Sequence, residues 1–306
     1  NWQNRLKILL LLNYFIYIEM KSHITNMCKQ KSDYFIAAAT NDTKILQNLL
    51  NKEKGTFDRR TSNAEQNIFH GFGAIHYAVY HGHQEAVKLL LPYELGLQTS
   101  ETQIIVAPGF GTAGAKYKLA DGSSCLMIAL LRKQIPILTS IIEYLQNNQS
   151  QVDQIVGKTN SMGLTNYVVG TICNYPEAIH LLLNPIFVQK ELLLVMEGDM
   201  TPSMNACYFG RHVTAICLNE LFKNPDIRDQ LTRMILSRDS EGQSCIAHLK
   251  SDNFKRFGVP EDQMLEIRQI MMNIVYQAYQ NAVNQPQFAQ LVKNFLKDES
   301  IEMMLQ

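Results

Sequence analysis

Hydrophobic residues recur at spacings of three and four along residues 71–91, the clearest pattern in the chain. Ile75 and Ala78 share one face of a first short helix, and the apolar residues between 86 and 91 share one face of a second. Gly82 separates the two segments, and because glycine has no Cβ it adopts the positive φ that a sharp turn requires. The pattern predicts a helix–turn–helix unit whose apolar faces need neighbours of the same kind to bury them.

Weaker copies of this pattern lie on both sides of residues 71–91. The clearest is residues 176–183, whose apolar positions align residue for residue with those of residues 84–91. Equivalent positions at 37, 78, 129, 170, 206 and 249 are 41, 51, 41, 36 and 43 residues apart. Because we expect the helix pairs to keep their length, the surplus residues belong to the connections. The copies occupy residues 34–50, 71–91, 121–142, 163–183, 199–210 and 241–248.

Residues 71–91 resemble an ankyrin repeat. The signature of that family is Gly-x-Thr-Pro-Leu-His-x-Ala, followed by Gly-His and a leucine-rich second helix. The chain has the glycine, the histidine and the alanine at Gly71, His76 and Ala78, and it has the Thr-Pro pair in the later copy at 201–202. A period of about 40 residues is also typical of HEAT and armadillo arrays. The Gly-x-Ser/Thr opening that recurs in the later copies favours the ankyrin family.

The resemblance implies an all-α fold. We expect an ankyrin-like α-solenoid of five to six helix–turn–helix repeats over residues 33–258. The sequences of residues 75–80 and 125–129 are similar to those of divergent ankyrin arrays of single-celled parasites, some of which follow a protein-kinase domain. No kinase motif occurs in these 306 residues.

Two segments depart from the repeat pattern. Residues 99–120 predict a β-hairpin arm inserted between the second and third repeats, because two strand-like stretches flank a glycine-rich run. In a phosphate-binding loop a lysine directly follows the last glycine, and a helix follows the loop. This run has neither feature, so we expect a flexible tip there. Residues 259–306 predict two helices that form a helical C-terminal cap on the exposed end of the array. A helix for partner binding or self-association is the alternative.

Residues 1–32 form an N-terminal segment with an apolar run at 5–18. The run is shorter than the roughly 20 apolar residues that span a membrane. Its charge order fits a signal peptide, but no clear small-residue cleavage site follows. Three interpretations stay open: a packed N-terminal helix, a targeting or anchor segment, or sequence that is not natively part of the domain.

Composition excludes some classes of function. The chain has 28 basic and 28 acidic residues and no basic run longer than two, so it lacks the clustered charge that non-specific nucleic-acid binding needs. Its six cysteines form no Cys-x-x-Cys pair, which disfavours a zinc site and a disulfide framework. We interpret them as small buried apolar residues in a reducing compartment, and we expect a cytoplasmic protein.

Candidate chemistry is sparse. The chain has no Gly-x-Ser-x-Gly and no His-Glu-x-x-His motif. Most of the histidines lie in or near the repeats, and the resemblance implies a structural role for His76, whose imidazole would bond backbone across the repeat. We therefore expect no catalysis, cofactor or metal. An unrecognised enzyme is an alternative, and it predicts a deep polar cleft with a titratable pair.

Binding of another protein is the function that the resemblance implies, because stacked helix pairs present an extended surface. In ankyrin arrays the contacts come from the hairpin tips and from the two positions before the glycine that ends the first helix. Leu131 would belong to the core instead if the helix phase is off by one. A membrane-anchored or secreted protein that uses residues 5–18 is an alternative. The implied contact residues are Phe69, His70, Tyr80, His81, Leu131, Arg132, Asn160, Tyr208, Phe209 and Arg238.

Overall fold

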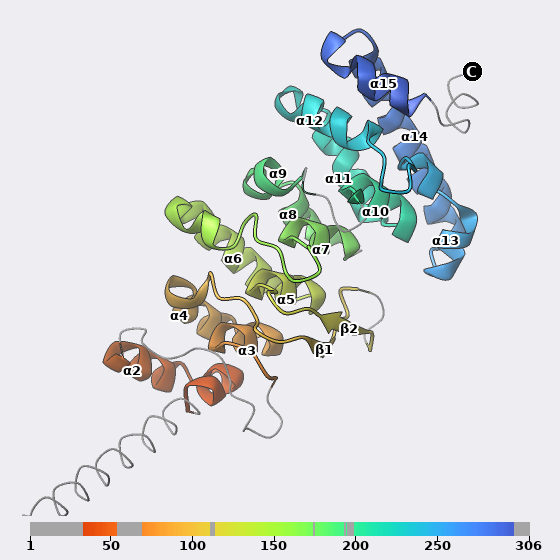
Figure 1. Cartoon of the computed structure of the whole chain (residues 1–306). Coiled ribbons are helices and arrows are strands. Elements are labelled where there is room, and N and C mark those ends of the chain that lie inside the picture. The colour runs from red at the N-terminus through yellow and green to blue at the C-terminus, as the bar shows by residue number, and fades with distance from the viewer. Residues whose placement is uncertain are drawn as a thin grey trace, which may run out of the picture.

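The computed structural model describes residues 33–53, 69–110, 114–173, 175–192, 194 and 199–296. Helices make up most of these residues and follow one another in chain order along an elongated body (Figure 1). The apolar run at 5–18 lies outside the described residues, so its three interpretations stay open. Among the described residues, no helix has the length and apolar character that a membrane span requires.

Short helices connected by tight turns build the body. Residues 33–40 form a first helix. The other α-helices are α2 (Thr43–Glu53), α3 (Ala74–His81), α4 (Gln84–Glu94), α5 (Cys125–Leu131), α6 (Ile135–Asn147), α7 (Asn166–Ile172), α8 (Ile179–Leu182), α9 (Pro185–Glu191), α10 (Pro202–Phe209), α11 (His212–Phe222), α12 (Pro225–Leu236), α13 (Ser251–Arg256), α14 (Glu261–Val283) and α15 (Ala289–Phe295).

The helices pack in two rows. The first helices of successive units contact one another in the order α3, α5, α7 and α10, and α4 contacts both α2 and α6 in the second row. Within a unit, α3 packs on α4, α5 on α6, α7 on α8 and α9, and α10 on α11. Each apolar helix face is therefore covered by its own partner helix and by the neighbouring units, as the amphipathic pattern requires.

One backbone signature recurs at the end of the first helices. Four residues after a buried alanine the chain enters the left-handed region, and the next N–H donates to the alanine carbonyl at 2.8 or 2.9 Å. This geometry satisfies a helix-terminal carbonyl and reverses the chain. The alanine and left-handed residue pairs are Ala37 and Asn41, Ala78 and Gly82, Ala129 and Lys133, and Ala206 and Gly210.

A second signature recurs where the first helices begin. Left-handed residues with φ between 58° and 78° stand at equivalent places in five copies, and in one of them Asp199 replaces the usual glycine. Two residues later, a serine or threonine hydroxyl caps the helices that begin at Cys125, Asn166 and Pro202. The left-handed residues are Gly71, Gly122, Gly163, Asp199 and Gly242.

The loop before the last copy has the same geometry as an earlier one. The Oδ1 atom of Asn160 accepts the N–H groups of Met162 and Leu164, and Oδ1 of Asp239 accepts those of Glu241 and Gln243. The expected copy at 241–248 therefore keeps the loop of a repeat, although only a 3₁₀ turn over Ile246–His248 follows in place of a full helix.

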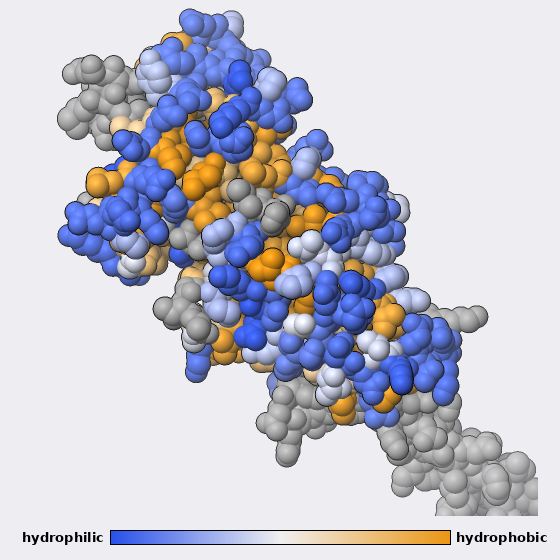
Figure 2. All heavy atoms as spheres, turned by 180° about the vertical axis from the view of Figure 1, so that it is seen from behind, coloured by the Kyte–Doolittle hydropathy of each residue, from blue (hydrophilic) through white to orange (hydrophobic). Residues whose placement is uncertain are grey.

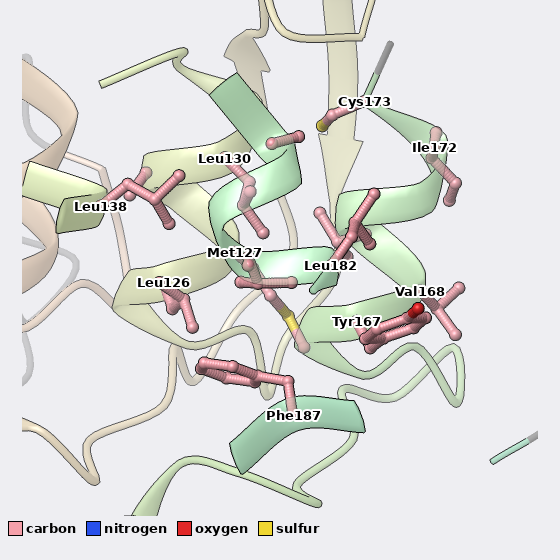
Figure 3. Packing of buried hydrophobic residues seen from close by; sticks show 14 of the residues in the cluster. Leu126, Met127, Leu130, Leu138, Tyr167, Val168, Ile172, Cys173, Leu182 and Phe187 are labelled. Atoms are coloured by element: carbon pink, nitrogen blue, oxygen red, sulfur yellow. The ribbon is translucent and has the colours of Figure 1, made fainter. Parts of the chain in front are cut away.

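Buried side chains from successive units interdigitate to form one continuous core. In Figure 3, Leu126 and Met127 of α5 pack beside Tyr167 of α7, Leu182 of α8 and Phe187 of α9. All five of these side chains are at most 1% exposed. The core also contains the described cysteines, which are buried free thiols, as the sequence predicted for small apolar positions.

Two buried glutamates cap first helices from within their own units. Glu94 ends α4 and accepts the N–H of Ile75 at 2.8 Å, near the start of α3. Glu191 ends α9 and accepts the N–H of Tyr167 at 2.6 Å, at the same position of α7. A negative charge at a helix N-terminus is favourable because the exposed N–H groups carry partial positive charge. The sequence pattern did not predict helix α9. This helix supplies α7 with the same kind of glutamate cap that α4 supplies to α3.

The connection between α4 and α5 contains a short sheet. Strand β1 (Gln103–Val106) pairs antiparallel with β2 (Lys116–Leu119), with Gln103 opposite Leu119 and Val106 opposite Lys116. We call residues 103–119 the arm. The tip at 111–113 lies outside the described residues.

The last helices cover the end of the body. Helix α14 packs on α11 and α12, and α15 packs on α12 and α14 (Figure 1). The face of α14 that the sequence predicted to be apolar is buried at Ile267, Met271 and Ile274. Helix α12 was not predicted and forms part of the longer connection after α11.

Candidate functional site

Four of the implied contact residues come together at the end of α3. The ring of Tyr80 lies 4.6 Å from that of Phe69 and 5.2 Å from that of His81, measured between centroids. Arg132, from the end of α5, places its Cζ 4.2 Å from the centroid of Tyr80 and donates through Nε to the Tyr80 carbonyl at 3.1 Å. We call Phe69, Tyr80, His81 and Arg132 the first aromatic cluster.

The arm lies against this cluster. Nη1 of Arg132 donates to the carbonyl of Val106 at 3.0 Å, and the N–H of Gly109 donates to the carbonyl of Leu131 at 2.8 Å. A Cβ on Gly109 would lie 2.3 Å from the carbonyl oxygen of Leu130, so only glycine permits this approach. The arm thus occupies part of the region in which the resemblance placed partner contacts at the end of α5.

Tyr208 and Phe209 form a second cluster with a residue that follows α13. Their rings lie 4.9 Å apart, and Phe257 lies 5.7 Å from Tyr208 and 4.9 Å from Phe209. Tyr208 also contacts the ring of His248 at 5.8 Å. We call Tyr208, Phe209 and Phe257 the second aromatic cluster. A recess of about 430 Å³ borders it; the lining residues include Met200, Lys250 and Asn253.

Arg211 connects the arm to the second aromatic cluster. Its Cζ lies 5.6 Å from the ring centroid of Phe110 in the arm and 5.4 Å from that of Phe209. Phe110 in turn lies 5.2 Å from Tyr117 of β2. Residues from α3, α5, α10 and the arm therefore form a band of aromatic and arginine side chains, which we call the arm face.

The structure corrects two of the ten implied contact residues, Leu131 and Asn160, and gives a third, Arg238, backbone partners at the end of the chain's described part. Leu131 is 1% exposed and Asn160 is 6% exposed, so neither side chain is available at the surface. The phase of α5 turns Leu131 inward, and Asn160 holds its own loop with its amide. Arg238 is half-buried and donates to the carbonyls of Asn294 and Phe295 at 3.0 and 3.1 Å, so it ties the loop after α12 to α15.

The remaining predicted residues stay at the surface. His81 is exposed, and Phe69, His70, Tyr80, Arg132, Tyr208 and Phe209 are half-buried. The sequence reasoning missed Phe110, Arg211 and Phe257. A phenylalanine inside the glycine-rich run was the one signal that could have revealed Phe110, because a flexible solvated tip has no use for a large apolar ring.

The histidines of this region have structural partners. His76 accepts the N–H of Gly73 through Nδ1 and bonds the Leu97 carbonyl through Nε2 at 3.1 Å, as the resemblance implied. His83 bonds the carbonyl of Ala39 in the preceding unit at 2.8 Å. Partial desolvation lowers the pKa of His81, and His83 and Arg132 add to that shift, which favours its neutral form.

In the described part of the chain, His248 and Asp239 form a buried acid–base pair whose contacts are structural. Nε2 of His248 lies 2.9 Å from Oδ2 of Asp239, whose other oxygen already accepts two backbone N–H groups of its loop. Within the residues that the structure describes, no group of three or more histidines, cysteines or acids is placed to hold a metal ion.

The family model for the ankyrin repeat matches residues 70–96, which include α3, α4 and the turn at Gly82. No curated protein matches the sequence.

Proposed function

We propose that this chain is an ankyrin-repeat protein, since the model of that family matches residues 70–96, and that it is a non-enzymatic scaffold that binds a partner protein through the concave face of a repeat array. The array spans residues 33–258, with the arm as a β-hairpin insertion within residues 99–120 and residues 259–306 as a helical cap. The recurrent left-handed residues at both ends of the first helices support this assignment, because they appear far beyond residues 70–96.

The observation that carries the proposal is the arm face itself. It presents rings and guanidinium groups from α3, α5, α10 and the arm. Each of these groups contacts another member of the band. Tyrosine, phenylalanine and arginine are enriched where protein interfaces gain most of their energy. The half-buried members of the band combine a fixed position with an exposed edge, which lowers the entropy cost of binding.

A second candidate surface lies on α14. Leu265, Tyr276 and Val283 of this helix are 59%, 50% and 43% exposed. On the face opposite to that of Figure 1, apolar side chains gather over the C-terminal part of the molecule (Figure 2). This exposure supports the alternative that the terminal helices bind a partner.

A photo-crosslinking amino acid tests the proposal. Placed at Tyr208 on the arm face, it should trap a partner from the native lysate, whereas the same amino acid at Tyr276 on α14 should not. Both positions are tyrosines on helices, so the two variants are matched in chemistry; circular dichroism should show that the half-buried position 208 keeps its fold. Crosslinking only from position 276 would move the binding surface to α14 and contradict the proposal.

Buried free thiols support a reducing compartment, and we place the protein in the cytoplasm. Enzymatic activity and anchoring through residues 5–18 remain the alternatives. Fractionation of the full-length protein separates the anchored form from the soluble scaffold.

A further inference from the structure

Arg211 is a buried cation whose guanidinium has no counter-charge in the described part of the chain. The residue is 8% exposed, and its Nε has no hydrogen-bond partner among the described residues. No carboxylate of the residues that the structure describes lies within ion-pair distance of it. By contrast, Arg132 and Arg238 each donate to at least two carbonyl oxygens.

The groups around Arg211 do not supply the missing charge. Burial raises the pKa of the Cys173 thiol to about 12 and that of the Tyr117 hydroxyl to about 12, so both are neutral at pH 7. Arg211 is the residue before α11, whose N-terminus adds partial positive charge. The rings of Phe110 and Phe209 offer cation–π contacts, which are weaker than the cost of burying a charge.

We propose that Arg211, between Phe110 of the arm and Phe209 of α10, is a binding site for an aspartate or glutamate side chain of the partner protein. This inference rests on the proposed function, because the site lies within the arm face and both of its flanking rings belong to that face. It adds to that function the chemistry of the partner: an acidic residue that enters beside aromatic rings.

The surroundings favour a carboxylate over a phosphate. A phosphate dianion is usually held by several donors, as in clusters of arginines. Here a single guanidinium lies among two aromatic rings and a neutral thiol. One planar guanidinium matches one planar carboxylate through two parallel N–H···O bonds. The ion pair would also restore the pairing that a buried charge requires.

A displayed library of random heptapeptides, selected on the full chain, tests the site. Enriched peptides should share an aspartate or glutamate at one position. Replacing that acid by its amide should weaken binding to the natural chain about tenfold or more, and binding to the Arg211→Gln variant by less than about twofold. Equal losses on both proteins, or enriched peptides without a common acid, would overturn the site.

Two controls separate this inference from the proposed function. Peptides that lose binding to Tyr208→Ala but not to Arg211→Gln would overturn the anion site and leave the arm face supported. Peptides indifferent to both substitutions would overturn both. Displacement of the peptides by inorganic phosphate far more strongly than by acetate, at equal ionic strength, would show a phosphate site and overturn the carboxylate assignment.

Stability gives an independent readout that needs no ligand. Arg211→Met should raise the melting temperature, because it removes a buried charge that has no partner. Arg132→Met should lower it, because that guanidinium has two carbonyl partners and a ring. If Arg211→Met destabilises the chain as much as Arg132→Met does, Arg211 is a structural residue and the proposal is wrong.

Discussion

The guanidinium of Arg132 lies over the ring of Tyr80, and its Nε donates to the carbonyl of the same residue at 3.1 Å. Tyr80 belongs to α3 and Arg132 follows α5, so this contact joins two successive units. A further bond from Arg132 to Val106 attaches the arm at the same point. One arginine therefore sets the relative positions of two units and the arm, and the arm face depends on it.

Replacing Arg132 by methionine should destabilise the protein by about 2–3 kcal/mol. The substitution keeps much of the apolar stem but removes charge-assisted bonds to two carbonyl oxygens. Thermal unfolding followed by circular dichroism measures the change. The comparison is Arg256→Met, since Arg256 is exposed, has a ring contact with Phe257 at 5.6 Å and should alter stability by less than about 1 kcal/mol. Equal effects of the two substitutions would contradict the role of Arg132.

Gly210 should tolerate alanine less well than Gly82 does. Both have positive φ, at 63° and 82°, so both variants carry backbone strain. A Cβ at Gly210 would meet Cγ2 of Val259 at 2.4 Å, whereas one at Gly82 would meet only the flexible end of Gln134 at 3.0 Å. We expect Gly210→Ala to lower the free energy of unfolding by at least about 1 kcal/mol more than Gly82→Ala does. Chemical denaturation of both variants decides this, and the reverse order would refute the packing around Gly210.

Replacing Glu191 by glutamine should destabilise the protein by about 1–3 kcal/mol at neutral pH. Its two oxygens accept the N–H groups of Gly157 and Tyr167 at 2.7 and 2.6 Å, so an amide NH₂ would face a donor on either side. Glu85→Gln is the control, because Glu85 is exposed and pairs with the exposed Lys88 on the same helix. The prediction fails if both variants unfold at the same denaturant concentration.

The same glutamate predicts a pH dependence. Burial raises the pKa of Glu191 above its ordinary value, although the hydrogen bonds it accepts oppose the shift. The folded chain therefore holds a proton at pH values where the unfolded chain has released it. The contribution of this group to stability is full below the ordinary glutamate pKa and is lost as the pH rises through the raised one. Unfolding free energies measured across that interval should fall in the natural chain by an amount that Glu191→Gln lacks.

Ala78→Asp should disrupt the stack of units. Ala78 is fully buried where α3 meets its neighbours, so a carboxylate there would lose its hydration without gaining a partner. We expect a loss of about 4 kcal/mol or more, seen as a large drop in the thermal midpoint. Thr139→Asp, on the exposed side of α6, provides the comparison and should change little. An unaltered midpoint for Ala78→Asp would refute our placement of the core.

The units were predictable because their chemistry is local. Glycines with positive φ, hydroxyl caps and apolar residues at helical spacing act within a few residues of one another, and Ala78, Ala129 and Ala206 keep the register that the sequence indicated. The helices α9 and α12 were missed because they lie in connections whose length varies. Both begin with an Asn-Pro pair, which is a helix-start signal, but that signal does not mark a helix as part of a unit.

The contact surface was only partly predictable, because it depends on contacts between distant residues. Tyr80 and Arg132 were both expected at the surface, but the sequence does not show that one stacks on the other. Arg211 was missed because its contact with Phe110 joins residues about 100 positions apart in the chain. Leu131 shows how the helix phase limits such a prediction, because one helical position separates a contact residue from a core residue.

Hydrogen exchange of the full chain tests the central claim most directly, measured with and without the purified partner that crosslinking has identified. Binding through the arm face should slow exchange in the segments that end α3, α5 and α10 and in β1, while α14 exchanges as before. Protection confined to α14, with the arm face unchanged, would contradict the account.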